Sequence, residues 1–144
     1  MHTNSRSDIS QKTGPLFEQV TQSIRVAVYT HYLEEQSDPD DNRYVWAYQV
    51  SISNEGHETL QLLNRYWHIT DSTGEIQEVR GEGVVGEQPV IKPGDVYRYT
   101  SGTPLKSSSG FMVGSYEMIN EAGVSFDIAV PSFSLDIPDT RVVN

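Results

Sequence analysis

Hydrophobic and polar residues alternate along most of this sequence with a period of two. The alternation is clearest where large hydrophobic residues occupy every second position: Tyr44, Trp46, Tyr48, Val50 and Ile52. Successive side chains of a strand point to opposite faces, so this pattern is typical of a strand with one buried face. The segment 44–52 is therefore predicted to be a half-buried strand.

The same period predicts further strands, separated by residues that favour turns. One strand is expected to contain Val20, Ile24, Val26 and Val28, and others are expected at 60–70, 76–80, 96–101, 111–119 and 124–130. The turns between them are expected at 54–57, 71–74, 93–94 and 120–123, where Gly, Pro, Asn and Asp collect. The acidic segment 34–42 is expected to be a loop, because proline and clustered like charges disfavour a strand.

Two of these segments carry information about their place in a sheet. The strand at 60–70 has bulk on both faces and should be central; Leu63, Trp67 and Ile69 are expected on one face and Leu62, Tyr66 and His68 on the other. A last strand at 133–137 is expected to be an edge strand, limited by Pro131 and Pro138.

Short strands at regular spacing, with almost no helical period, predict an all-β fold. We interpret it as a two-sheet antiparallel β-sandwich, with a small closed barrel as the alternative. The domain should cover residues 16–138, between a polar N-terminal arm (1–15) and a C-terminal tail (139–144). The residues expected to build its core are Trp46, Val50, Ile52, Trp67, Phe126 and Ile128.

Composition narrows the possible functions. The chain has no cysteine, which excludes disulfides, thiolate metal sites and a cysteine nucleophile. A net charge of −10 disfavours binding to nucleic acid or to an anionic membrane surface. The start has no apolar run suited to a signal sequence, and no stretch is long and apolar enough to span a bilayer, so we expect a cytoplasmic location.

The segment 81–86 reads G-E-G-V-V-G and matches the dinucleotide-binding pattern G-x-G-x-x-G, with Gly81, Gly83 and Gly86 as the candidate nucleotide-binding residues. That pattern holds pyrophosphate at the start of a helix, and here extended chain with Pro89 follows. We therefore expect a bend that changes the direction of the strand, with Val84 and Val85 restarting the extended chain and one of them facing the core. Nucleotide binding stays an alternative hypothesis.

Candidate metal ligands are scattered. His68 lies on a predicted strand, His31 precedes the acidic loop, and Asp38 and Asp40 lie in that loop. The loop begins like a calcium site but lacks its glycine and its bidentate glutamate. A sensor or carrier of divalent cations is thus a second alternative. No spacing indicates a catalytic set, so we expect no enzyme, no catalytic residue and no cofactor.

Five short motifs, in order and at matching spacing, resemble the ApaG family: R-Y-W-H-I-T-D at 65–71, E-V-R-G-E-G-V-V-G-E-Q-P at 78–89, K-P-G at 92–94, Y-T-S-G-T-P-L at 99–105 and G-S-Y at 114–116. The resemblance covers about 24–138. It implies a fibronectin type III or immunoglobulin-like sandwich and a link by phenotype to cobalt and magnesium handling. Related domains in an F-box protein and a polymerase-interacting protein look like protein-binding modules, and the glycine segment has been likened to a nucleotide site. The resemblance supplies no catalytic residue.

The leading hypothesis is therefore a non-catalytic module that binds another protein. Clustered tyrosines and tryptophans would suit such a surface where they share an exposed face. Pro89 and Pro93 bracket residues 90–91, which we expect to form an edge strand or loop able to accept a partner strand. A second copy of the chain is the alternative partner.

Overall fold

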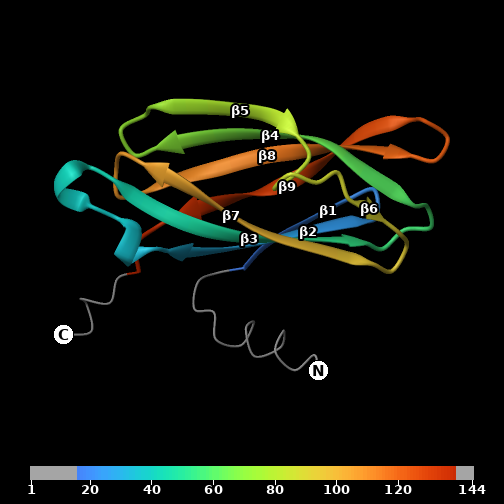
Figure 1. Cartoon of the computed structure of the whole chain (residues 1–144), viewed down its shortest axis with the longest axis horizontal. Helices are drawn as coiled ribbons and strands as arrows, with labels where there is room; N and C mark the ends of the chain where they lie inside the picture. The colour runs from blue at the N-terminus through green and yellow to red at the C-terminus, as the bar shows by residue number, and fades with distance from the viewer. Residues whose placement is uncertain (1–15, 139–144) are drawn as a thin grey trace, which may run out of the picture.

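The computed structural model describes residues 16–138, which form two antiparallel sheets packed face to face (Figure 1). The first sheet has the order β1 (Leu16–Thr21), β2 (Ile24–Tyr32), β3 (Tyr44–Asn54), β7 (Val96–Leu105). The second has the order β5 (Ile76–Glu82), β4 (Leu60–Asp71), β8 (Gly110–Asn120), β9 (Ser125–Leu135), and the short β6 (Val90–Ile91) also pairs with β4. Two 3-10 turns, η1 (Glu34–Gln36) and η2 (Pro39–Asp41), occupy the acidic loop. The predicted all-β sandwich is confirmed; the predicted arm and tail lie outside the described residues.

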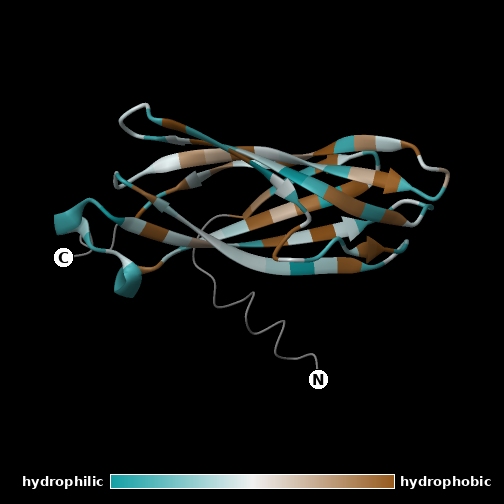
Figure 2. Cartoon of the chain, turned by 45° about the horizontal axis from the view of Figure 1, so that its top comes forward, coloured by the Kyte–Doolittle hydropathy of each residue, from teal (hydrophilic) through white to brown (hydrophobic). Residues whose placement is uncertain are grey.

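The core fills the space between the two inner faces, and hydrophobic and hydrophilic bands alternate along the strands (Figure 2). Its largest fully buried side chains are Trp46, Tyr116 and Phe133. Five of the six predicted core residues are buried, and Phe126 is partly buried against them. Each such side chain contributes about 1.5–3 kcal/mol of transfer free energy.

The sandwich is closed along one side and open along the other. At the closed side β9 packs against β1 and β2, and the backbone N–H of Ala129 donates a hydrogen bond to Oγ1 of Thr21. At the opposite side β7 ends the first sheet and β5 ends the second, and each pairs with only one strand among the described residues. Within residues 16–138 there is no helix of the length and apolar character needed to cross a bilayer.

The prediction that Val20, Ile24, Val26 and Val28 lie on one strand was wrong, because the chain forms a tight hairpin between Val20 and Ile24. Gln22 and Ser23 turn the chain with φ values of 48° and 68°, so Val20 lies on β1 and Ile24 begins β2. Two consecutive positive φ angles are typical of a type I′ hairpin turn, which Asn and Gly usually form. Gln and Ser carry no such signal.

The predicted faces of 60–70 were wrong in part. β4 is central, as expected, but the pairing of β4 with β8 shifts between Leu62 and Asn64. Leu63 is the extra residue of this β-bulge, so Leu62, not Leu63, shares the buried face with Trp67. A bulge changes the alternation without changing the composition of the strand.

The predicted separate strand at 133–137 is also corrected. β9 continues through Pro131 to Leu135, and its pairing with β8 shifts between Met112 and Gly114. The bulge accommodates the proline, which donates no hydrogen bond. β9 lies at the end of its sheet, so the expected edge position is confirmed.

Candidate functional site

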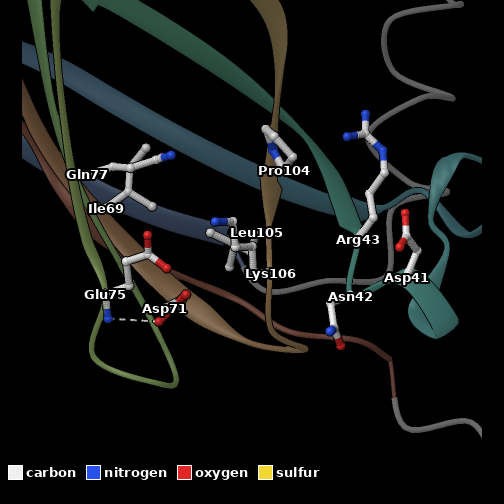
Figure 3. Close-up of a pocket in the computed structure, with 10 residues that line it drawn as sticks. All are labelled: Asp41, Asn42, Arg43, Ile69, Asp71, Glu75, Gln77, Pro104, Leu105 and Lys106. Carbon is white, nitrogen blue, oxygen red and sulfur yellow. Dashed lines mark hydrogen bonds between the residues drawn. The ribbon is translucent and has the colours of Figure 1, made fainter.

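Along the open side, two hollows follow one another between β7 and the β4–β5 hairpin, and we call them together the β7 cleft. The larger has a volume of about 480 Å³ and is shown in Figure 3. One wall comes from the hairpin, one from the end of β7 and one from the end of η2 and the two residues that precede β3. The lining residues are Asp41, Asn42, Arg43, Ile69, Asp71, Glu75, Gln77, Pro104, Leu105 and Lys106.

Asp71 organises the hairpin wall of this hollow. Its Oδ1 accepts hydrogen bonds from the backbone N–H groups of Thr73 and Glu75, and from Oγ1 of Thr73, at 2.7–3.0 Å. The Thr73 hydroxyl and these backbone donors hold the pKa of the Asp71 carboxyl below its ordinary value. The carboxylate therefore closes the turn as a charged group, and its Oδ1 accepts all three of these hydrogen bonds.

The smaller hollow, of about 240 Å³, lies further along the cleft where β7 passes the glycine segment. Its lining residues are Tyr48, Arg65, Trp67, Val84, Val85, Gly86, Tyr99, Thr100 and Ser101. Arg65 is half-buried, and its Nη1 donates to the carbonyl oxygens of Glu82 and Gly83 at 3.0 and 2.9 Å. It forms no ion pair with any carboxylate of residues 16–138. The guanidinium thus carries an uncompensated charge at the cleft while it ties down the end of β5.

Tyrosine hydroxyls line the floor beside Arg65. Tyr99 on β7 and Tyr116 on β8 are hydrogen-bonded to each other, and burial raises the pKa of both phenols. Burial also raises the pKa of Tyr48, whose hydroxyl bonds to Ser101. These phenols therefore stay neutral near pH 7 and offer hydrogen bonds rather than charge.

The glycine segment has a structural explanation at each glycine. Gly81 pairs with Arg65, and a Cβ there would lie 2.8 Å from Nη2 of Arg65. Gly83 has a φ of +64°, and a Cβ would lie 2.1 Å from the carbonyl oxygen of Glu87. Gly86, with φ +80°, completes a tight turn that Val84 and Glu87 close through two backbone hydrogen bonds.

Two expectations for this segment were wrong. β5 and β6 both run antiparallel to β4 along the same edge, so the segment is an excursion from one interrupted edge strand and not a change of direction. Val85 does not restart an extended chain, because its φ is 49° and it sits at the exposed tip of the turn. The other expectations are confirmed: Val84 is buried, and the pair 90–91 is a short edge strand. A strand, and no helix, follows the glycines, so the geometry that makes this motif hold pyrophosphate is missing.

The structure does not gather the candidate metal ligands. His31 is exposed on β2 of the first sheet, whereas His68 lies on β4 of the second. Asp38 and Asp40 are exposed around η2. Among residues 16–138, no three His, Asp or Glu side chains are grouped so that they could hold a metal ion.

Sequence reasoning missed the arrangement on the outer face of the second sheet. Tyr66 on β4 donates from its hydroxyl to Oε2 of Glu78 at 2.6 Å, and Cζ of Arg80 lies 4.4 Å from the centroid of the Tyr66 ring. Most other aromatic residues pack in the core, as expected, with Trp67 against Tyr116 and Phe133 in edge-to-face contacts. To find this arrangement from the sequence, one would have had to know that β5 pairs with β4 and which residues of each strand point to the outer face.

Comparison with known proteins decides the family. A model of the ApaG domain matches residues 34–120. The chain belongs to the ApaG family. A protein ApaG from Mesorhizobium japonicum is 58% identical over 126 residues, covering 88% of this chain and 97% of that protein. A protein ApaG from Paramagnetospirillum magneticum is 59% identical with the same coverage.

A solved structure agrees with the ApaG assignment. The crystal structure of the ApaA protein from Bordetella pertussis is 44% identical, with a TM-score of 0.79, and the match covers 81% of this chain and 95% of that one. The resemblance to the ApaG family inferred from the five motifs is therefore confirmed, together with the sandwich fold.

Proposed function

We propose that this ApaG protein is a non-catalytic module that binds another protein, and that it takes an extended segment of its partner along the outer edge of β7. The observation that carries the proposal is the position of this edge, which is unpaired among residues 16–138 and borders the β7 cleft along its length. Addition of a strand to a free sheet edge is a common way of recognising peptides.

The hydrogen-bond register identifies which groups of β7 are available. The carbonyl oxygen of Asp95 accepts from the N–H of Asn54, so the odd-numbered residues of β7 face β3. The even-numbered residues point their N–H and C=O groups away from the sheet, and they are Val96, Arg98, Thr100, Gly102 and Pro104. Pro104 has no N–H, which is tolerated at an edge.

The cleft would supply specificity to such a strand. Side chains of an added strand would alternate between the outer face and the cleft, as in any sheet. The cleft offers them the cations of Arg43 and Lys106, the carboxylate of Glu75 and the uncompensated guanidinium of Arg65. We propose no cation carrier as a second function, because residues 16–138 contain no group of three His, Asp or Glu side chains that could hold a metal ion.

A proline substitution tests the proposal. Thr100→Pro removes one outward N–H of β7 and no hydrogen bond to β3, so it should weaken capture of partner proteins from a lysate while the melting temperature stays near that of the wild type. Thr100→Ala is the matched control, because it removes the hydroxyl and keeps the N–H.

Site-specific photo-cross-linking locates the contact. A benzophenone amino acid at position 100 should link to the partner, and one at Glu121, in the exposed turn at the far end of the β8–β9 hairpin, should not. Partner capture that is equal in Thr100→Pro and Thr100→Ala, or links from 121 and none from 100, would contradict the proposal.

A further inference from the structure

β5 is the second unpaired edge, and it forms the rim of the second sheet (Figure 1). All of its residues except Gly81 are exposed, although Val79 is only 37% exposed. Two hydrogen bonds show how its backbone is oriented: the N–H of Asp71 donates to the carbonyl of Glu75, and the N–H of Gly83 donates to the carbonyl of Leu63. Both place the odd-numbered residues toward β4, so the even-numbered residues direct their N–H and C=O groups into solvent.

The even-numbered residues also place two opposite charges on one face. Val79 pairs with the buried Trp67, so Glu78 and Arg80 lie on the other, outer face of the sheet. Tyr66 holds both, through its hydroxyl to Glu78 and its ring to Arg80. Neither residue forms an ion pair with a described residue. The two side chains are therefore ordered and still without a charge partner.

We propose that the free edge of β5 binds the same edge of a second copy of this chain, in an antiparallel pair whose two-fold axis passes between the two Val79 residues. In this register Glu78 of each copy lies opposite Arg80 of the other, so the axis creates two ion pairs. The backbone groups of these same residues point outward and complete the ladder. The two second sheets become one continuous sheet across the axis.

The neighbouring registers are unfavourable, which is why the pairing is specific. Residues whose N–H and C=O groups point away from β4 must lie opposite each other to form hydrogen bonds. The nearest alternative symmetric registers therefore place the two-fold axis at Glu78 or at Arg80 instead of Val79. Centring on Glu78 brings two glutamates together. Centring on Arg80 brings two arginines together and places each Glu78 opposite Glu82. Opposite charges across a strand pair stabilise it and like charges destabilise it.

The net charge of −10 acts against non-specific association of two copies. A dimer must therefore be stabilised by local contacts that outweigh this repulsion. The proposed register supplies them by placing Arg80, the positive charge of each β5, against a carboxylate of the other copy. The β5 edge belongs to the second sheet and the β7 edge to the first, so the two proposed contacts use different strands.

Charge reversal tests the register. By sedimentation velocity over a range of concentrations, the wild-type chain should show a monomer–dimer equilibrium, and Glu78→Arg and Arg80→Glu should each sediment as monomers at concentrations where the wild type is dimeric. An equal mixture of these two variants should dimerise again, because two arginines of one chain then face two glutamates of the other. A wild type that stays monomeric, single variants that dimerise like the wild type, or a mixture that stays monomeric would overturn the proposal.

A cysteine at the axis gives a second measurement. Residues opposite each other in a non-hydrogen-bonded pair have Cα atoms about 4.5 Å apart, within the range that a disulfide spans. Because the chain has no cysteine, Val79→Cys introduces a single thiol. Mild oxidation should convert Val79→Cys to a covalent dimer and leave Val124→Cys, at an exposed position in the β8–β9 turn, monomeric. Equal cross-linking of the two variants, or none in Val79→Cys, would count against the axis.

Discussion

The hydroxyl oxygens of Tyr99 and Tyr116 lie 2.5 Å apart, and this hydrogen bond joins β7 of the first sheet to β8 of the second. It spans the sandwich beside the β7 cleft, where the rings of Tyr48 and Trp67 also meet across the two sheets. Both side chains are buried or nearly so, and each hydroxyl is the hydrogen-bond partner of the other. The pair therefore adds a polar link between the two sheets at the cleft.

We expect strong coupling between these two tyrosines. Tyr99→Phe or Tyr116→Phe leaves the other buried hydroxyl unpaired and should lower the free energy of unfolding by about 1–3 kcal/mol. The double variant leaves no unpaired group, so its loss should be well below the sum. Denaturant unfolding of the double-mutant cycle measures this, with Tyr97→Phe, near the surface, as the control. Additive losses would show that the two hydroxyls act independently.

The same pair predicts a loss of stability in alkali. Burial raises the pKa of both phenols in the folded state above their ordinary value of about 10. Their contribution is fully present below that value. It is lost as the pH rises above about 10, because the unfolded chain then releases protons that the folded chain retains. The Tyr99→Phe/Tyr116→Phe variant should lose less stability between about pH 9 and pH 11 than the wild type; an equal loss would contradict the assignment.

Gly86 is required for its backbone conformation alone, whereas Gly83 is required both for its conformation and for lack of space. Both have positive φ, but a Cβ at Gly86 meets nothing within 4 Å, whereas one at Gly83 meets the carbonyl oxygen of Glu87 at 2.1 Å. Gly86→Ala should cost about 1–2 kcal/mol for the left-handed backbone alone. Gly83→Ala should cost about 1–3 kcal/mol more, since the turn must move. Thermal or urea unfolding of both variants checks this, and equal losses would mean that the close approach is not rigid.

Asp71 predicts sensitivity to acid. Its hydrogen bonds hold the pKa of the folded carboxyl below the ordinary aspartate value of about 3.9. The stabilisation is therefore present above that value and is lost as the pH falls through the lowered pKa. Asp71→Asn should be less stable than the wild type at pH 7, and the difference should shrink toward about pH 2. A difference that does not change with pH would show that the charge of Asp71 is unimportant.

Strands with strict alternation could be predicted from the sequence, and those with an irregularity could not. β3 alternates between buried and less buried residues from Trp46 to Asn54 without interruption, so this part of its buried face was predictable. The bulge at Leu63 and the proline at Pro131 lie inside strands that otherwise have an ordinary strand composition, so the composition does not reveal the irregularity. The hairpin at 22–23 uses Gln and Ser in conformations that these residues seldom adopt.

The candidate site was less predictable, because its parts are distant in the sequence. Tyr99 meets Tyr116 across the two sheets, and Arg65 reaches the carbonyl groups of 82–83 only because β5 pairs with β4 in that register. The glycine pattern matched a phosphate-binding motif letter for letter. Its glycines are required instead because the Arg65 side chain packs against Gly81 and because Gly83 and Gly86 form a tight turn with positive φ. Such roles depend on which strands become neighbours.

The contact between Thr21 and Ala129 has a consequence for how the protein is made. The first described strand must wait for the last before the closed side of the sandwich can form, so their contact spans most of the chain. On the ribosome, β1 and β2 emerge long before β9 is synthesised, and their inner faces, with Ile24, Val26 and Val28, stay uncovered during that interval. Non-local pairing of this kind slows folding and exposes hydrophobic strands to other nascent chains. The chain is therefore expected to need a chaperone most in the interval between the emergence of β2 and the completion of β9 (Ser125–Leu135).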